Sequence, residues 1–157
     1  DLQFVFSQAP NLKDEVYKKY FKNSDFKIIK GENQALLSVS DALILASGTV
    51  ALEASLYNTP MIIAYKGPYL FYLIYLLVRC IKRVSLPNII TDKDIVPEII
   101  ENSAKPDFIA YNIEKLIYDE EVRNKQIEGL KSVRELLSDK NSSLEVAKRI
   151  NEELSEM

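Results

Sequence analysis

Short apolar runs alternate with segments of helical pattern through the first two-thirds of this 157-residue chain. Each run has the length and composition of a buried strand, and each helical segment is long enough to connect two strands. Two strands joined by a single helix run parallel, because the helix carries the chain back along the sheet. A parallel sheet also needs helices on both faces. The alternation therefore predicts an α/β fold with a parallel sheet covered on both faces.

The pattern changes character after Pro87, where apolar residues begin to recur every three or four positions. We expect a single domain, with an α/β core over about residues 1–101 and a helical tail over residues 106–157. Because residue 1 is not Met and the chain begins inside a predicted strand, we also expect a piece of a longer protein. The predicted strands cover residues 2–6, 26–29, 42–46 and 60–65, and the predicted helices cover residues 10–21, 31–39, 50–57, 94–101, 106–118, 119–137 and 142–154.

The amino-acid composition excludes several kinds of catalytic and binding site. The chain has no histidine, which excludes histidine-dependent triads, histidine-ligated metals and an imidazole base from these residues. Cys80 is the sole cysteine, so an intrachain disulfide cannot form and a reducing compartment is expected. A net charge of −3 argues against a nucleic-acid partner.

A turn of small residues, Ser47-Gly48-Thr49, joins the predicted strand at 42–46 to the predicted helix at 50–57. A helix N-terminus has unpaired N–H groups and the positive end of the helix dipole, which suit a phosphate. An ordinary helix cap would look the same. Glu53, however, is a lone acid in an apolar helix and falls outside the capping-box position. A carboxylate there could accept hydrogen bonds from both ribose hydroxyls, so the turn and Glu53 together indicate a nucleotide site.

Residues 61–90 hold four basic residues and no acid, in a chain of net charge −3. Within them, residues 69–78 are uncharged and bulky, and they are too few to span a bilayer, which takes about 20 residues. An aromatic, apolar segment flanked by Arg79, Lys82 and Arg83 is typical of a helix at a membrane surface. A buried helix, or one covered by another domain, would have the same composition. Both interpretations stay open.

Three polar motifs carry weaker signals. Asp92-Lys93-Asp94 has the Asp-x-Asp spacing that holds a metal in some sugar transferases, but its place before a predicted helix favours an N-cap. The acid run over residues 119–121 suits the N-terminus of the next predicted helix. Asn88, in the turn Ser85-Leu86-Pro87-Asn88, could be a plain turn residue or a paired donor and acceptor in a site.

Four segments together resemble the lipid A disaccharide synthase family in their order and spacing. They are Ser47-Gly48-Thr49 with Glu53, residues 60–66, residues 85–88, and Val96-Pro97-Glu98. The resemblance implies a glycosyltransferase of GT-B fold with two Rossmann-like domains, of which this chain is most of the C-terminal, donor-binding one. It implies transfer of 2,3-diacylglucosamine from its UDP-linked form to 2,3-diacylglucosamine 1-phosphate, giving lipid A disaccharide 1-phosphate and UDP.

The same resemblance implies roles for individual residues. Ser47, Gly48 and Thr49 match the loop beside the diphosphate, and Glu53 matches the acid at the ribose. Asn88 and Glu98 match further polar positions of the UDP site. The expected membrane and lipid contacts are Tyr69, Phe71, Tyr72, Leu73, Leu76, Arg79, Lys82 and Arg83.

The family further implies no metal and no cofactor, with the catalytic base in an N-terminal domain that this chain lacks. The chain alone is then expected to be inactive. The implied location is the cytoplasmic surface of the inner membrane, with the full-length protein as a candidate homo-oligomer. Two other functions are weighed from the sequence: another UDP-sugar enzyme of this fold, such as a UDP-N-acetylglucosamine 2-epimerase, and a non-catalytic module that docks on a membrane or partner.

Overall fold

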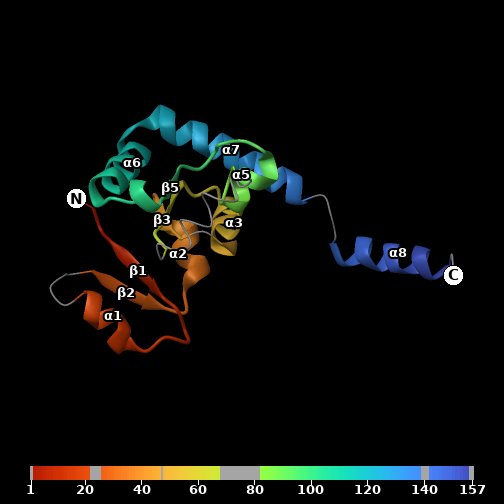
Figure 1. The fold of residues 1–157 in the computed structure, drawn as a ribbon, viewed down its shortest axis with the longest axis horizontal. Coiled ribbons are helices and arrows are strands. Elements are labelled where there is room, and N and C mark those ends of the chain that lie inside the picture. The colour runs from red at the N-terminus through yellow and green to blue at the C-terminus, as the bar shows by residue number, and fades with distance from the viewer. Residues whose placement is uncertain (1, 22–25, 47, 68–81, 139–141, 156–157) are drawn as a thin grey trace. The chain divides into compact units, whose positions relative to one another are not determined.

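The computed structural model describes residues 2–21, 26–46, 48–67, 82–138 and 142–155 (Figure 1). The chain forms two compact units, Asp1–Ser40 and Asp41–Met157. Each unit contains parallel strands joined through helices, and each is described by itself below.

The first unit is built on two parallel strands, β1 (Val5–Gln8) and β2 (Lys27–Lys30), joined through helix α1 (Asp14–Tyr20). Helix α2 (Asn33–Val39) follows β2. The centroid of the Phe6 ring lies 4.3 Å from that of Phe21 and 5.2 Å from that of Phe26. These aromatic contacts join β1 to the residue that ends α1 and to the residue before β2.

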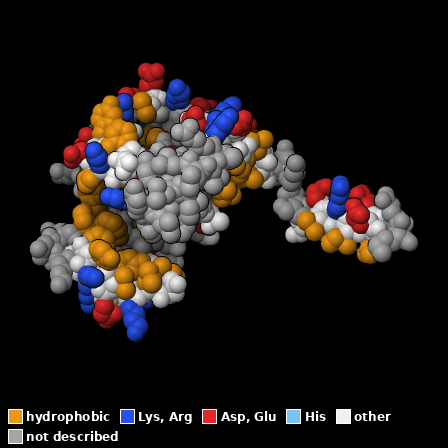
Figure 2. All heavy atoms as spheres, viewed as in Figure 1, with side chains coloured by type: hydrophobic (Ala, Val, Ile, Leu, Met, Phe, Trp, Pro, Cys, Tyr) orange, Lys and Arg blue, Asp and Glu red, His pale blue; other side chains and the backbone are white. Residues whose placement is uncertain are grey.

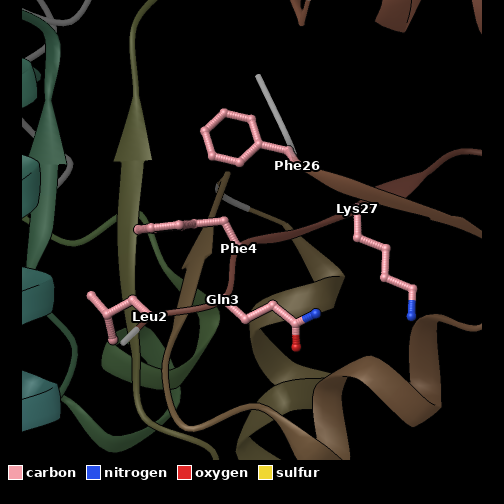
Figure 3. Close-up of a pocket in the computed structure, with 5 residues that line it drawn as sticks. All are labelled: Leu2, Gln3, Phe4, Phe26 and Lys27. Atoms are coloured by element: carbon pink, nitrogen blue, oxygen red, sulfur yellow. The ribbon is translucent and has the colours of Figure 1, made fainter. Parts of the chain in front are cut away.

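A hollow of about 430 Å³ lies at the amino ends of β1 and β2 (Figure 3). Its lining residues are Leu2, Gln3, Phe4, Phe26 and Lys27. Ligands of open parallel sheets gather at the opposite, carboxyl ends of the strands. The hollow therefore lies at the strand ends where such sheets do not bind ligands, and none of its lining residues is a predicted nucleotide contact.

The second unit contains a three-stranded sheet in the order β3 (Leu43–Leu45), β4 (Met61–Tyr65) and β5 (Glu98–Ile100). Both pairs are parallel. Helix α3 (Thr49–Leu56) connects β3 to β4, and helix α5 (Leu86–Thr91) lies between β4 and β5 in the sequence. The predicted α/β fold with parallel strands is confirmed.

Helices cover both faces of this sheet (Figure 1). On one face, Ile62 and Ile99 pack with Ile113 and Leu116 of helix α6 (Pro106–Tyr118). Side chains alternate along a strand, so Ile63 points to the opposite face. Ile63 has no exposed surface; α3 packs against β4, and α5 packs against α3.

Helix α7 (Glu120–Ser138) packs against α3, α5 and α6. Its Leu130 and Val133 have no exposed surface, in agreement with the helical spacing seen in the sequence. Asp119 precedes it and accepts hydrogen bonds from the N–H groups of residues 121 and 122, which confirms the acid run as a helix N-terminus. The last helix, α8 (Ser142–Ser155), carries exposed apolar side chains, among them Ile150 and Leu154.

The helix predicted over residues 94–101 is wrong. Strand β5 occupies its second half and a 3-10 turn, η1 (Glu101–Ser103), follows. Pro97 disfavours helix for the residue before it, and its carbonyl accepts a hydrogen bond from Ile63 N–H at the start of the ladder. The N-cap predicted at Asp92 or Asp94 is also wrong, because the helix that it would begin does not form. Asp92 instead ends α5 in the left-handed conformation, with φ 52°. The expected turn at Ser85–Asn88 proves to be the start of α5, which has Pro87 in its first turn.

We predict that Gly129→Ala destabilises the protein, although alanine is the better helix former by about 1 kcal/mol. A Cβ at this position in α7 would lie 2.5 Å from Cγ2 of Ile95 and 3.0 Å from its Cγ1. Overpacking of this kind costs about 1–3 kcal/mol, which exceeds the propensity gain. Urea denaturation measures the change. In an Ile95→Ala background the same substitution should cost much less, and a stabilising effect in the original background would contradict the prediction.

Candidate functional site

The carboxyl ends of β3, β4 and β5 lie at one edge of the second unit's sheet, because the three strands are parallel. Three short segments follow the strands there: the turn at Gly48, the pair Lys66 and Gly67, and Glu101. Open α/β sheets bind their ligands at this edge. We therefore build the candidate site from these segments and the helices that follow them.

Gly48 begins helix α3 in a backbone conformation that favours glycine, with φ 146° and ψ −166°. A Cβ there would meet no atom within 4 Å, so the backbone conformation rather than space selects glycine. The first turn of α3, all of whose residues are described, holds no acidic side chain. Its positive end is thus available to an anion, with the exposed Thr49 beside it. Ser47 lies outside the described residues.

Glu53 lies on the exposed side of α3, whereas Ala51, Ala54 and Ser55 are fully buried on the other side. It follows Thr49 by four residues, which places the two side chains on the same face of the helix, one turn apart. A ligand whose phosphate meets the first turn of α3 would extend past Thr49 towards this carboxylate. The sequence prediction that joins the turn and Glu53 in one site is compatible with this arrangement.

Asn88 and Glu98 are brought together by hydrogen bonds. The Asn88 amide is 2% exposed; its Nδ2 donates to Glu98 Oε1 over 2.9 Å and to the Val96 carbonyl over 2.8 Å. Its Oδ1 accepts from the N–H groups of Ile95 and Val96 over 2.8 and 2.9 Å. Asn88 is thus more than a plain turn residue, because its amide pairs as donor and acceptor within the protein, whereas its place in a ligand site stays a prediction.

Glu98 accepts three further hydrogen bonds from the residues that lead into α5. Val84 N–H donates over 2.9 Å, Ser85 N–H over 2.8 Å and Ser85 Oγ over 2.6 Å. The carboxylate therefore joins β5 to the start of α5. Sequence reasoning missed the part played by Ser85, because no local pattern relates residue 85 to residue 98.

Arg83 donates hydrogen bonds to Asp92 and, over 2.8 Å, to Asp94. The hydrogen bond to Asp94, with the charges of both acids, raises the pKa of Arg83. The two carboxylates of the Asp-x-Asp motif are thus engaged by a guanidinium. Lys82 is also a predicted lipid contact, and its side chain is exposed, whereas Arg83 is half-buried.

The other predicted lipid contacts, Tyr69, Phe71, Tyr72, Leu73, Leu76 and Arg79, lie outside the described residues. Within the described ranges, no helix is both long enough and apolar enough to cross a membrane.

The parallel α/β architecture and the helix N-terminus at the carboxyl edge define a Rossmann-like domain of the kind that GT-B glycosyltransferases use. Residues 1–151 match the family model described as lipid-A-disaccharide synthetase. The chain belongs to this family, which comprises glycosyltransferases of lipid A and lipopolysaccharide biosynthesis. The resemblance found in the sequence is confirmed.

Curated relatives named lipid-A-disaccharide synthase agree with this assignment. The protein of Anaeromyxobacter dehalogenans is 33% identical over 153 residues, which are 96% of this chain and 40% of that protein. The protein of Rickettsia prowazekii is 32% identical over 158 residues, covering 98% of this chain and 42% of that protein. The protein of Hydrogenovibrio crunogenus is 38% identical over 125 residues. The chain thus spans about 40% of the length of the relative from Anaeromyxobacter dehalogenans.

We predict that Asn88→Ala lowers the free energy of unfolding by about 2–4 kcal/mol, because the N–H groups of Ile95 and Val96 lose their shared acceptor. Asn112→Ala is the matched control, since its amide donates to Phe108 O one turn back on α6. The control should change stability by no more than about 0.5 kcal/mol. Thermal and urea unfolding measure both variants, and equal effects would contradict the central role of the Asn88 amide.

Proposed function

We propose that this chain is the donor-binding part of a glycosyltransferase that acts on lipid-linked sugars. The reaction transfers 2,3-diacylglucosamine from its UDP-linked form to 2,3-diacylglucosamine 1-phosphate and releases UDP. All 157 residues would form one incomplete UDP-sugar-binding domain, with the α/β core over about residues 1–101 and the tail over residues 106–157. Membership of the family and the sheet edge described above support this proposal.

The observation that carries the proposal is the combination of the Gly48 turn and the exposed Glu53 on one face of α3. The diphosphate of UDP would lie at the first turn of α3, where Ser47, Gly48 and Thr49 offer hydroxyl and backbone N–H donors. The ribose would lie one turn further on, with both hydroxyls donating to the Glu53 carboxylate. A helix N-terminus and neutral donors oppose the negative charge that develops on the leaving diphosphate.

Asn88 and Glu98 are assigned to the same UDP site. Their hydrogen bonds hold α5 to β5, and α5 packs against α3. They would thus define the wall of the site that faces α3. The proposal places the catalytic base outside this chain, so the chain alone is expected to bind UDP without transferring sugar.

We further propose that residues 69–83 meet the cytoplasmic surface of the inner membrane. An exposed Lys82 next to an apolar, aromatic segment favours contact with lipid headgroups. Arg83 contributes less to that surface, because Asp92 and Asp94 pair with it. Both substrates carry acyl chains, so a protein that handles them gains from lying on the bilayer that holds them.

We predict that Glu53→Ala weakens UDP binding by about tenfold to a hundredfold, since a hydrogen bond to a charged group contributes about 1.5–3 kcal/mol. Isothermal titration of the intact protein that contains this chain measures the affinity. The protein should bind UDP more tightly than 2′-deoxy-UDP, and Glu53→Ala should remove that preference, because the missing hydroxyl is one of the two that donate to the carboxylate.

Glu114→Ala is the control for the UDP experiment, because Glu114 is an exposed acid on α6. It should leave both affinities unchanged. An unaltered preference for UDP over 2′-deoxy-UDP in Glu53→Ala would disprove the ribose role. Absence of UDP binding by the unaltered protein would disprove the proposed function.

Membrane contact predicts that changing Leu73 and Leu76 together to Ser reduces flotation with anionic phospholipid vesicles by more than about tenfold. The matched control changes Val39 and Leu136 to Ser, because both are exposed, at 75% and 55%. Vesicle association that survives the first pair of changes, or that falls equally in the control, would refute the membrane role.

A further inference from the structure

Strand β3 lies at one end of the three-stranded sheet, and among the strands in the described ranges it pairs only with β4. The Leu43 N–H donates to Pro60 O over 2.9 Å, so it points towards β4. Backbone groups of successive residues in a strand point to opposite edges, so the N–H and C=O of Ile44 point away from β4. The outer edge of β3 therefore offers a donor and an acceptor to a further strand.

The sequence of β3 is that of a strand with neighbours on both sides. Residues 43–45 are Leu-Ile-Leu, a continuous apolar run of the kind found in buried parallel strands. Edge strands, by contrast, usually carry charges, proline or a local distortion that prevents pairing with another chain. At the other end of the sheet, β5 has these features: Pro97 precedes it, Glu98 lies within it, and Glu101 follows it in the left-handed conformation. Strand β5 is thus built as an edge, whereas β3 is not.

The exposure of β3 differs sharply from that of its neighbour. Ile44 lies opposite Ile62 of β4, on the same face of the sheet, yet Ile44 is 48% exposed and Ile62 has no exposed surface. Leu43 and Leu45 are also partly exposed, although the β4 residues opposite them are fully buried. Strand β4 has a strand on each side, and a further strand at the outer edge of β3 would give β3 the same cover.

The occupant that fits this edge is a parallel strand of apolar residues. Both strand pairs of this sheet are parallel, and parallel strands are joined by crossover helices that cover the sheet. The region of the Anaeromyxobacter dehalogenans protein that this chain matches is 40% of that protein. A protein of that length has ample polypeptide outside the matched region to supply one more strand with its helix.

A parallel strand at this edge would also border the candidate site. Parallel neighbours end at the same edge of the sheet, so the carboxyl end of the occupant would lie beside the Gly48 turn that follows β3. Doubly wound sheets bind ligands in the crevice where the strand order reverses. From β3 the chain continues to β4 and β5 in one direction, so a strand on the other side of β3 would place this reversal at Gly48.

We propose that the outer edge of β3 is a docking surface for a parallel, apolar strand that the same polypeptide supplies from outside these 157 residues. The strand pairs with the backbone of Ile44, covers the apolar side chains of β3 and forms the second side of the crevice at Gly48. The inference goes beyond the proposed function and does not depend on it, because backbone pairing and burial define the edge without reference to UDP.

Hydrogen exchange in the intact protein that contains this chain, followed by NMR without UDP, tests the pairing. The Ile44 amide should exchange at least about a hundredfold more slowly than an unprotected amide. The Leu43 amide, which is bonded within the sheet, is the internal control and should be protected in the same way. Exchange of Ile44 at the unprotected rate, with Leu43 protected, would overturn the inference.

Photo-crosslinking in the same protein identifies the occupant. A diazirine analogue of leucine in place of Ile44 should join to a peptide from outside these 157 residues, besides its neighbours in the sheet, and mass spectrometry identifies that peptide. A mixture of isotope-labelled and unlabelled protein shows whether the link lies within one polypeptide. Links confined to residues 1–157, links between two copies or links to another protein would each overturn the inference.

Ile44→Lys tests the burial of the edge. A docked strand would enclose the new charge, so exchange of the amide at residue 44 should accelerate at least about tenfold. Ile28→Lys is the matched control, because Ile28 is an isoleucine of strand β2 that is 37% exposed, and it should change that exchange by less than about twofold. Unchanged protection in Ile44→Lys would overturn the inference. If Leu43 lost its protection as well, β3 itself would have unfolded, and the crosslink would decide.

Discussion

The carboxylate of Glu98 and the amide of Asn88 hold the second unit together at the point where its elements meet. Four donors converge on the one carboxylate, and the amide uses both its oxygen and its nitrogen. A partly buried charge is costly without such partners. Because the partners come from the start of α5 and from the residues before β5, the carboxylate links two elements that the sheet alone would leave apart. The wall of the proposed UDP site depends on this link.

A second buried amide, that of Gln126 on α7, ties that helix to β4 and to the segment before β5. Gln126 of α7 accepts a hydrogen bond from Met61 N–H over 2.7 Å and donates to Met61 O over 3.0 Å. It also donates to Ile95 O over 3.3 Å, while Ile95 N–H donates to Asn88. The short segment before β5 is therefore fixed through its backbone by side chains from two helices. The close approach of Gly129 to Ile95 belongs to the same junction. Buried polar groups that are fully paired in this way specify one arrangement of the helices around the sheet.

Local sequence patterns predicted those features that local physics determines. The alternation of apolar runs and helical segments identified the parallel strands, and the predicted helix at 106–118 has the bounds of α6. Strand β5 was missed, because a short apolar run next to a proline has no periodicity of its own, and its pairing with β4 decides its conformation. The same limit applies to the site. The Gly48 turn could be predicted because strand, glycine and helix are contiguous, whereas the contact of Glu98 with Ser85 joins residues distant in the sequence. The left-handed turn at Glu101 carries no sequence signal either, because a positive φ at a residue other than glycine is fixed only in the folded chain.

Glu98 on β5 and Glu101 directly after it hold two residues that lie far apart in the sequence, Val84 and Gly67. Both contacts depend on a short strand whose own place in the sheet is set by its pairing with β4 and its packing on α6. A substitution that shifts β5 would therefore move Val84 and Gly67 together, although neither residue is part of that strand.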